Sequence, residues 1–516
     1  MEFPEDIWQH IHSLMPMRDA ARAACVSRMF LRFWRGYPSV TIDRKILASS
    51  SQQGIRFWTE DERGKYILTK AQQVLESRGS SSTVVRSVKL DLSTCQKVIV
   101  SATSAGGLVD CWLRSFVKPG IEDITLFLSE WDNNDYYYYY GHDCLPEYTF
   151  PCSLLSDDDE KITSLQSLSL SSCGFHPNEG MTTLLGCWKN LSTVCLHRVA
   201  VADEELGFFL AGCLALERLT LSCCDTIGSL KIPHALRRLR SLRVRSCRLL
   251  RTIESGAPML ATVWYDGWPL LRFSLGGALE TTKLEVRATR MGDVIQYAGA
   301  KLPSAAPDLE TLVLSTVYER LKAPVMPDKF KQLKHLVICL GRSTVFCAGY
   351  DFFSLACFLD ACPALETFVL RVTVSRSSIA DGIRWYNNPN RGKPDKEASW
   401  KRQEVSELHH GGIIGNLRKV TITGFCSANS LVELTCHILV AAAASLEHMT
   451  LDTSPGYDRK HTSYGRCWQM SAEALREAET ALAAARKYVE PKVPDGVDLK
   501  VLGPCSRCHL GMRDNS

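Results

Sequence analysis

A six-residue phrase, Leu-x-x-Leu-x-Leu, recurs along the chain and limits the folds that the chain can adopt. Its clearest copy lies at Leu165, Leu168 and Leu170. Ten further copies keep mostly apolar residues at the same three positions: Leu191/Val194/Leu196, Leu216/Leu219/Leu221, Leu239/Leu242/Val244, Leu260/Val263/Tyr265, Thr281/Leu284/Val286, Leu309/Leu312/Leu314, Leu333/Leu336/Ile338, Leu365/Phe368/Leu370, Leu417/Val420/Ile422 and Leu446/Met449/Leu451. From Leu165 to Thr281, successive copies begin 26, 25, 23, 21 and 21 residues apart.

The end of each phrase, apolar–x–apolar, has the period of a short strand with one buried face. One such strand cannot bury that face alone, whereas stacked copies bury it by forming a parallel sheet backed by helices or turns. The spacing lies in the range of roughly 20–29 residues that is typical of leucine-rich repeats. The sequence therefore predicts an α/β fold, an irregular leucine-rich-repeat solenoid with a concave parallel sheet, over residues 85–470.

Two segments interrupt the repeats, near 130–162 and near 374–412. The first contains five consecutive tyrosines and the acidic run 157–160, which we interpret as a solvated loop because it lacks the ligand spacing of a metal site. The second is polar and basic, and we expect a surface loop there.

Composition narrows the class of protein. The chain has 516 residues, of which 45% are hydrophobic and 22% are charged, as in soluble folded proteins. A net charge of +4 gives no reason to expect nucleic acid as a partner. No run of about 18 apolar residues is present, so we expect no membrane partner. The opening residues MEFPEDIW lack the features of a secretion signal, which favours a cytoplasmic or nuclear protein.

The chain has 21 cysteines, and several occupy fixed positions in the repeats. Cys173, Cys224 and Cys247 each follow the last apolar residue of a phrase by three residues, and Cys213 and Cys362 fall just before a phrase. Cysteines locked to a repeat are typical of small buried apolar residues. We therefore expect buried thiols in a reducing compartment rather than disulfides.

Residues 3–36 have the pattern of three short helices. Ile7, Ile11 and Leu14 form one apolar stripe after Pro4, and Pro16 ends the first helix. A second helix is expected to run to about Val26 and a third to carry Phe30 and Trp34. Three helices of this length cannot build a large core, so the segment is expected to need a partner surface.

This segment resembles an F-box, whose pattern it matches at Pro4, Asp6, Ile7, Ile11, Leu14, Pro16, Asp19, Val26, Ser27, Arg28 and Trp34. It differs at Phe3 and Ala20, where leucine is usual, and at Phe30, where tryptophan is common. The resemblance implies that residues 1–40 form an F-box that binds a Skp-type adaptor and, through it, cullin. The contact residues that it implies are Pro4, Ile7, Ile11, Leu14, Pro16, Val26 and Trp34. The alternative is a helical cap on the solenoid.

The whole chain resembles the plant-type F-box/leucine-rich-repeat proteins, which are substrate receptors of Skp–cullin–F-box ubiquitin ligases. Residues 41–84 would be a helical join to the solenoid, and residues 471–516 a capping helix and tail. The resemblance implies a non-catalytic adaptor that holds an unknown protein substrate. A ligase-independent interaction scaffold is the alternative, which Phe3 and Ala20 keep open.

We find no sequence motif of an active site, neither a P-loop nor a nucleophile elbow nor a zinc-protease helix. Cys505, Cys508 and His509 match the haem-attachment pattern, but we find no export signal, which that chemistry needs. The same residues would supply half of a zinc site, but the sequence offers no second ligand pair at regular spacing. We therefore expect no catalytic residues, no metal and no cofactor.

The remaining candidate is the concave face of the sheet, where the x residues of each phrase point away from the core. On the five copies between 191 and 287 this face is net basic. Arginine and tryptophan are enriched at binding hot spots. The predicted substrate-binding residues are Arg218, Arg243, Arg245, Trp264 and Arg287. The alternative is a solvated sheet face whose charges are balanced by neighbouring acids.

Overall fold

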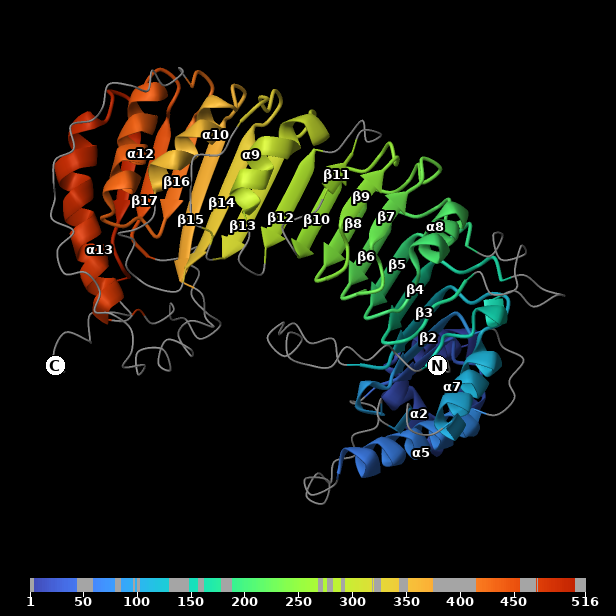
Figure 1. Cartoon of the computed structure of the whole chain (residues 1–516). Helices are drawn as coiled ribbons and strands as arrows, with labels where there is room; N and C mark the ends of the chain where they lie inside the picture. Colours follow the sequence, from blue (N-terminus) through green and yellow to red (C-terminus); the bar gives the residue numbers. More distant parts are fainter. Residues whose placement is uncertain are drawn as a thin grey trace, which may run out of the picture. The chain divides into compact units, whose positions relative to one another are not determined.

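The computed structural model of the chain describes residues 4–43, 59–78, 85–95, 98–99, 103–129, 148–155, 162–177, 188–267, 272–275, 282–288, 293–317, 319, 326–342, 351–374, 414–454, 470 and 472–505. They belong to two compact units, Met1–Leu260 and Ala261–Ser516. Each unit contains consecutive parallel strands (Figure 1). The predicted insertions near 130–162 and 374–412 lie mainly outside the described residues.

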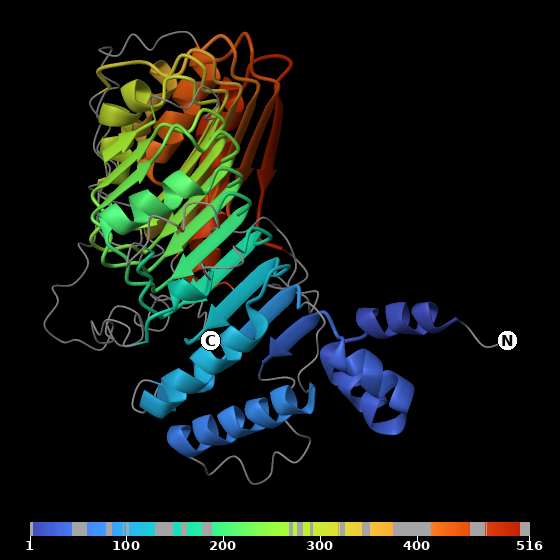
Figure 2. The ribbon, with the colours of Figure 1, turned by 90° about the vertical axis from the view of Figure 1, so that its right-hand side faces the viewer.

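The first unit begins with three short helices, as predicted: α1 (Glu5–Leu14), α2 (Met17–Val26) and α3 (Arg28–Arg35). Prolines occupy the N-cap positions of α1 and α2, because proline fixes the backbone there and lacks the N–H that a first turn leaves unpaired. Strand β1 (Ser39–Ile42) follows directly. Two longer helices, α5 (Glu60–Arg78) and α7 (Thr103–Phe116), lie side by side in Figure 2, and the Trp112 indole on α7 donates a hydrogen bond to the Gln72 side chain on α5.

Six further strands continue the sheet of the first unit: β2 (Ser87–Asp91), β3 (Asp123–Phe127), β4 (Ser167–Ser171), β5 (Thr193–His197), β6 (Arg218–Ser222) and β8 (Ser241–Arg245). All pair in parallel and in register from β1 to β8. The second and fourth residue of every strand is buried. The first, third and fifth residues form the opposite side, which we call the polar face.

The buried side of these strands is covered by helix α8 (Asp203–Gly212) and by β7 (Ser229–Ile232), which pairs with β9 (Thr252–Ser255). A group of aromatic rings fills the core beneath them: Trp188 and Phe209 have centroids 5.0 Å apart, and Phe175 lies 5.1 Å from Phe209. Edge-to-face aromatic pairs of this kind stabilise a core beyond the area they bury.

Four strands of the first unit end in the same turn. Ser172, Arg198, Cys223 and Ser246 follow β4, β5, β6 and β8, and all four have φ values between 52° and 55°. The N–H of Ser172 donates to the His197 carbonyl at 2.9 Å, and the N–H of Arg198 donates to the Ser222 carbonyl at 2.8 Å. The backbone hydrogen-bond ladder therefore extends one residue beyond each strand and keeps the fifth residues of neighbouring strands in register.

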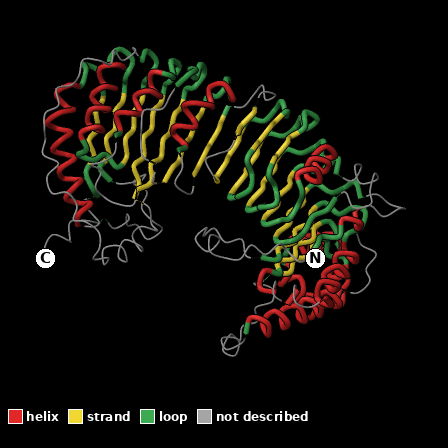
Figure 3. Tube along the Cα trace, in the orientation of Figure 1, coloured by secondary structure: helices red, strands yellow, loops and turns green. Residues whose placement is uncertain are grey.

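The second unit contains the strands β10 (Thr262–Gly267), β12 (Lys283–Ala288), β13 (Thr311–Val317), β14 (His335–Arg342), β15 (Thr367–Val374), β16 (Lys419–Thr423), β17 (His448–Asp452) and β18 (Asp498–Leu502), all parallel and in this order, besides the short β11 (Arg272–Ser274). Helices α9 (Val294–Ala305), α10 (Ala356–Asp360) and α12 (Asn429–Ala441) lie on one side of these strands, shown red beside the yellow strands in Figure 3. Helix α13 (Ala472–Ala484) follows and continues into one wider turn to Val489.

These strands confirm the fold predicted from the repeated phrase. The last two apolar positions of all eleven copies lie on strands β4, β5, β6, β8, β10 and β12–β17. Strands β2 and β3 lie within the predicted range 85–470 and bury Val88, Leu90, Ile124 and Leu126 in the same alternation. Strands β1, β7, β9, β11 and β18 were not predicted.

The cysteines expected to be buried are buried. Cys173, Cys213, Cys224, Cys247 and Cys362 have 1% of their surface exposed or less, and all are free thiols. Burial raises the pKa of Cys213 and of Cys362, which keeps both thiols protonated. No helix among the described residues is both long and apolar enough to cross a membrane.

Candidate functional site

The first three helices expose a group of apolar side chains, which we call the apolar surface. The exposed fractions are 41% for Ile7, 41% for Ile11, 72% for Leu14 and 84% for Val26. Pro4 and Pro16 are exposed as well. Six of the seven predicted adaptor-binding residues are therefore accessible. Ile7, Ile11 and Leu14 share one face of α1 by their helical spacing, and contiguous exposed apolar side chains of this kind mark interaction sites.

The packing of the opposite face of α1 explains why Ile7, Ile11 and Leu14 are exposed. His12 is buried, and its ring stacks on Phe30 with a centroid distance of 5.7 Å. Its Nε2 lies 3.2 Å from the carbonyl oxygen of Ala20, and burial lowers the pKa of the imidazole. Because His12 fixes one face of α1 against α2 and α3, Ile7, Ile11 and Leu14 face away from the helices.

The prediction that the Trp34 side chain contacts the adaptor is wrong. Trp34 is 2% exposed and packs in a cluster with Met17, Ala20 and Tyr37. Its indole N–H donates to the Ser77 hydroxyl of α5 at 3.4 Å. Trp34 therefore joins the three helices to α5 and positions the apolar surface without contributing to it.

The predicted concave-face residues fall into two groups. Arg218 on β6 and Arg243 on β8 are exposed, and Arg245 on β8 is half-buried; all three lie on the polar face of the first unit. Trp264 and Arg287 belong to the second unit, where their in-register neighbours are Glu285 and Asp266. The expected neighbouring acids are therefore present beside the second group.

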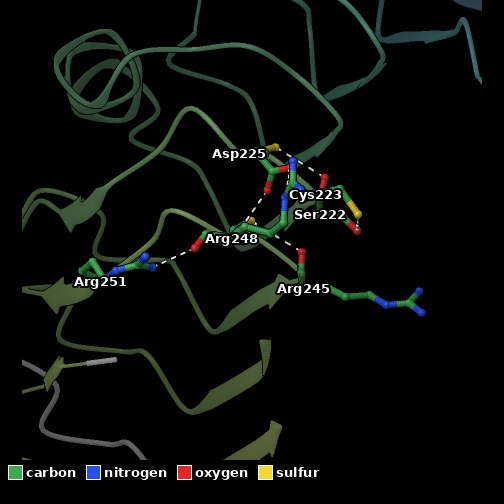
Figure 4. Close-up of polar contacts among 8 residues, drawn as sticks. Ser222, Cys223, Asp225, Arg245, Arg248 and Arg251 are labelled. Atoms are coloured by element: carbon green, nitrogen blue, oxygen red, sulfur yellow. Dashed lines mark hydrogen bonds and ion pairs between the residues drawn. The ribbon is translucent and has the colours of Figure 1, made fainter. Parts of the chain in front are cut away.

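Charge is concentrated around the first group. Residues 218–251 contain nine lysines and arginines and one acid, Asp225. Asp225 accepts hydrogen bonds from the backbone N–H and from Nε of Arg248, both at 2.8 Å. Figure 4 shows this pair and the Arg245 side chain extending away from it. Arg251 donates to backbone carbonyls, and Lys231 lies beside Glu254 in register. Of the other six arginines, Arg218, Arg243 and Arg245 lie on the polar face, and Arg237, Arg238 and Arg240 precede β8 in the sequence.

His197 is the fifth residue of β5 and belongs to the polar face, yet its side chain is buried. His197 is 6% exposed on β5, and burial, followed by the charges of Arg198 and Arg245, lowers its pKa to about 4. The imidazole is therefore neutral near pH 7 and adds nothing to the positive charge of the arginines.

This shift predicts an acid-sensitive first unit. The unfolded histidine binds a proton below about pH 6.5, whereas the folded one does so only below about pH 4. The stability that His197 contributes is therefore complete above pH 6.5 and is lost as the pH falls to about 4, by up to about 3 kcal/mol. Thermal unfolding measured across this window should show a smaller loss in His197→Gln than in the original chain, and equal slopes would contradict the assignment.

The comparison between variant and original chain matters because Glu319, in the second unit, acts in the opposite direction. Its carboxylate accepts a hydrogen bond from the Ile295 N–H at 2.9 Å, and burial raises its pKa to about 7. That contribution is complete below about pH 4.5 and is lost as the pH rises to about 7. Glu319 is common to both chains, so its effect cancels in the difference.

The described residues contain no group of three or more histidine, cysteine or acidic side chains that could hold a metal ion. Cys505 is half-buried, whereas Cys508 and His509 lie outside the described residues. The described residues offer two candidate binding surfaces, the apolar surface and the polar face.

An F-box-like group of three helices followed by leucine-rich repeats defines the F-box/leucine-rich-repeat class of proteins. The chain belongs to this class: a family model described as "At1g61320/AtMIF1, LRR domain" matches residues 78–506, and the F-box domain model matches residues 1–39. Proteins of this class are typically non-catalytic adaptors, and the F-box domain generally binds Skp-type adaptors.

Two curated relatives come from Arabidopsis thaliana. The F-box protein At5g03100 is 22% identical over 242 residues, which are 47% of this chain and 61% of that protein. The F-box/LRR-repeat protein At3g03360 is 22% identical over 252 residues, which are 48% of this chain and 43% of that protein. The matched part thus covers less than two thirds of either relative.

Proposed function

We propose that the chain is a substrate-recognition adaptor of a Skp–cullin–F-box ubiquitin ligase. The observation that carries the proposal is the apolar surface of Ile7, Ile11, Leu14 and Val26 on helices that match the F-box model. In this function the Skp-type adaptor covers the apolar surface, and the repeats hold the protein to be ubiquitinated.

The energetics favour a bound partner at this surface. Fully burying one valine, leucine or isoleucine side chain contributes about 1.5–3 kcal/mol, so these four residues supply the core of a stable interface. The chain itself breaks no bond in this scheme. It raises the effective concentration of the substrate near the ubiquitin carrier, which converts a bimolecular encounter into a local one.

Ile11→Asp is expected to weaken capture of the Skp-type adaptor at least about thirtyfold, because it removes apolar contact and forces a carboxylate into the interface. The measurement is quantitative pull-down with the purified adaptor. Val440→Asp is the matched control. Val440 is 71% exposed on α12 of the second unit, and its substitution also replaces an exposed apolar side chain with a carboxylate. Equal recovery of both variants would exclude the apolar surface as the adaptor site.

The alternative, a ligase-independent scaffold, rested partly on Ala20. That residue is fully buried between Met17 and Trp34, so its departure from the F-box pattern changes the helix core and leaves the apolar surface intact. Phe3 lies outside the described residues. Co-purification of cullin separates the two functions, because only the ligase adaptor brings cullin with it.

A further inference from the structure

A third candidate binding surface lies at the edge of the first unit where strands β5, β6 and β8 begin. The turn before each strand has a buried residue at its start and another three residues later, and the N–H of the second donates to the carbonyl of the first. The pairs are Trp188/Leu191, Cys213/Leu216 and Leu236/Leu239, at 3.1, 3.0 and 3.3 Å. Because both ends of each turn are anchored in the core, its two central residues lie at the surface.

These central positions place an exposed leucine between cations. Leu214, in the turn before β6, is 52% exposed. Lys189 occupies the same position in the turn before β5, and Arg237, followed by Arg238, in the turn before β8; all three are exposed. The Ala215 N–H donates to the Lys189 carbonyl at 3.1 Å, so the first two turns are in contact. We call Lys189, Leu214, Arg237 and Arg238 the turn row.

The cations of the turn row are not neutralised by nearby carboxylates. Among the described residues, Lys189, Arg237 and Arg238 take part in no ion pair. Glu217 is the acid in the turns before β5, β6 and β8. The Arg240 N–H donates to the Glu217 carbonyl at 2.9 Å, so these two exposed residues lie side by side and their charges offset each other. The turn row therefore keeps three positive charges.

Other described acids of these strands and their neighbours lie farther away or beside cations. Asp225 and Glu254 have Arg248 and Lys231 next to them. The acids at 122–123, at the start of β3, are two strands beyond β5, about 10 Å. The acids at 203–205 begin α8, about 14 Å from the end that leads to β6. Asp266 on β10, the strand after β8 in the sheet order, is the fifth residue of its strand, about 14 Å from the end where that strand begins. These separations exceed the screening length of about 8 Å in physiological salt.

We propose that the turn row binds a short acidic segment of the protein that the repeats hold. An apolar side chain of this segment packs on Leu214, and carboxylates on either side of it pair with Lys189 and Arg237. This inference rests on the proposed adaptor function.

The spacing of the turn row fits an extended segment. Neighbouring strands are about 4.8 Å apart, so the two cations arise roughly 5 Å on either side of Leu214. In an extended chain, side chains two residues apart lie on the same side at about 7 Å, within reach of lysine and arginine side chains that arise there. An apolar centre with a polar rim is typical of protein–protein interfaces, whereas surfaces that bind nucleic acid are more polar.

The test uses the full chain and a labelled peptide that has one leucine, a glutamate two residues to either side of it, and serine elsewhere. Arg237→Gln/Arg238→Gln is expected to bind this probe about tenfold more weakly, because two exposed charge pairs are lost. Leu214→Ser is expected to bind it about fivefold more weakly, because the apolar contact is lost. The affinity of the original chain should fall as salt rises.

The chain offers matched controls for both variants. Lys329→Gln/Lys331→Gln removes two exposed cations from the turn before β14 in the second unit, where the turn before the neighbouring strand β13 carries Asp308. Leu249→Ser removes a leucine that is 55% exposed after β8, at the other end of the strands. Both controls should bind the probe like the original chain.

Four results would overturn the inference: unchanged binding by Arg237→Gln/Arg238→Gln, an equal loss in Lys329→Gln/Lys331→Gln, equal binding of a peptide with serine for the leucine, or equally tight binding of a single-stranded oligonucleotide of matched charge. Capture of the Skp-type adaptor is measured in parallel for every variant. Retained capture with unchanged probe affinity defeats this inference alone. Absent capture by the original chain, with arginine-dependent probe binding, defeats the ligase function and leaves the turn row standing as a peptide-binding surface.

Discussion

Trp34→Ala is expected to unfold the three leading helices and to abolish adaptor capture. The side chain is 2% exposed and packs between α2 and α5. Removing a buried tryptophan costs about 3–5 kcal/mol, because the apolar transfer energy is lost and a cavity remains. A segment of three short helices has little other core to compensate, so most molecules should lose its structure.

Limited proteolysis and adaptor pull-down, read together, check this prediction. Trp34→Ala should be cleaved rapidly within the leading helices, whereas Ile11→Asp should resist cleavage as the original chain does and still fail to bind. Trp34→Phe, which keeps a ring in the cluster, is the control and should bind. A protease-resistant Trp34→Ala that captures the adaptor normally would show that the cluster is not needed to hold the helices.

Gly424→Ala is expected to destabilise the second unit by about 4 kcal/mol. Gly424 follows β16 with φ at +71°, where a residue with a Cβ is strained. A Cβ at this position would lie 2.2 Å from the carbonyl oxygen of Val372 on the neighbouring strand β15. A backbone atom cannot rotate away, so the strand itself must shift, and the overpacking cost adds to the conformational strain.

Gly496→Ala separates these two costs. Gly496 also has a positive φ, +94°, yet nothing lies within 4 Å of its Cβ position. It should lose only about 1 kcal/mol, from the conformation alone. Denaturant unfolding of both variants measures the difference. Equal losses would mean that the contact with Val372 relaxes without cost.

The repeated strands could be predicted because their signal is local. Apolar–x–apolar with a leucine three residues earlier specifies the buried face, whatever precedes it. The end strands β1 and β18 lack that leading leucine at the expected spacing, although Val40/Ile42 and Leu499/Val501 keep the apolar alternation. Strand β7 pairs with β9 behind the sheet, and that pairing depends on a neighbouring repeat rather than on its own sequence.

The candidate adaptor site was likewise predictable where its signal is local and not where it depends on distant residues. Helical spacing places Ile7, Ile11 and Leu14 on one stripe, and the structure exposes that stripe. The burial of Trp34 depends partly on α5, where Ser77, 43 residues further along the chain, accepts a hydrogen bond from the indole N–H. A pattern read within 35 residues cannot reveal that contact. The burial of His197 likewise arises from packing among neighbouring repeats.

The buried cysteines give the chain a set of internal reporters. Cys25 and Cys111 are exposed, whereas Cys213 lies in the core of the first unit and Cys362 in that of the second. A thiol-specific reagent therefore modifies the exposed pair at once and reaches each interior thiol only when its surroundings open. Mass spectrometry of the labelled peptides would then time the opening of each unit separately in native buffer, without any engineered probe.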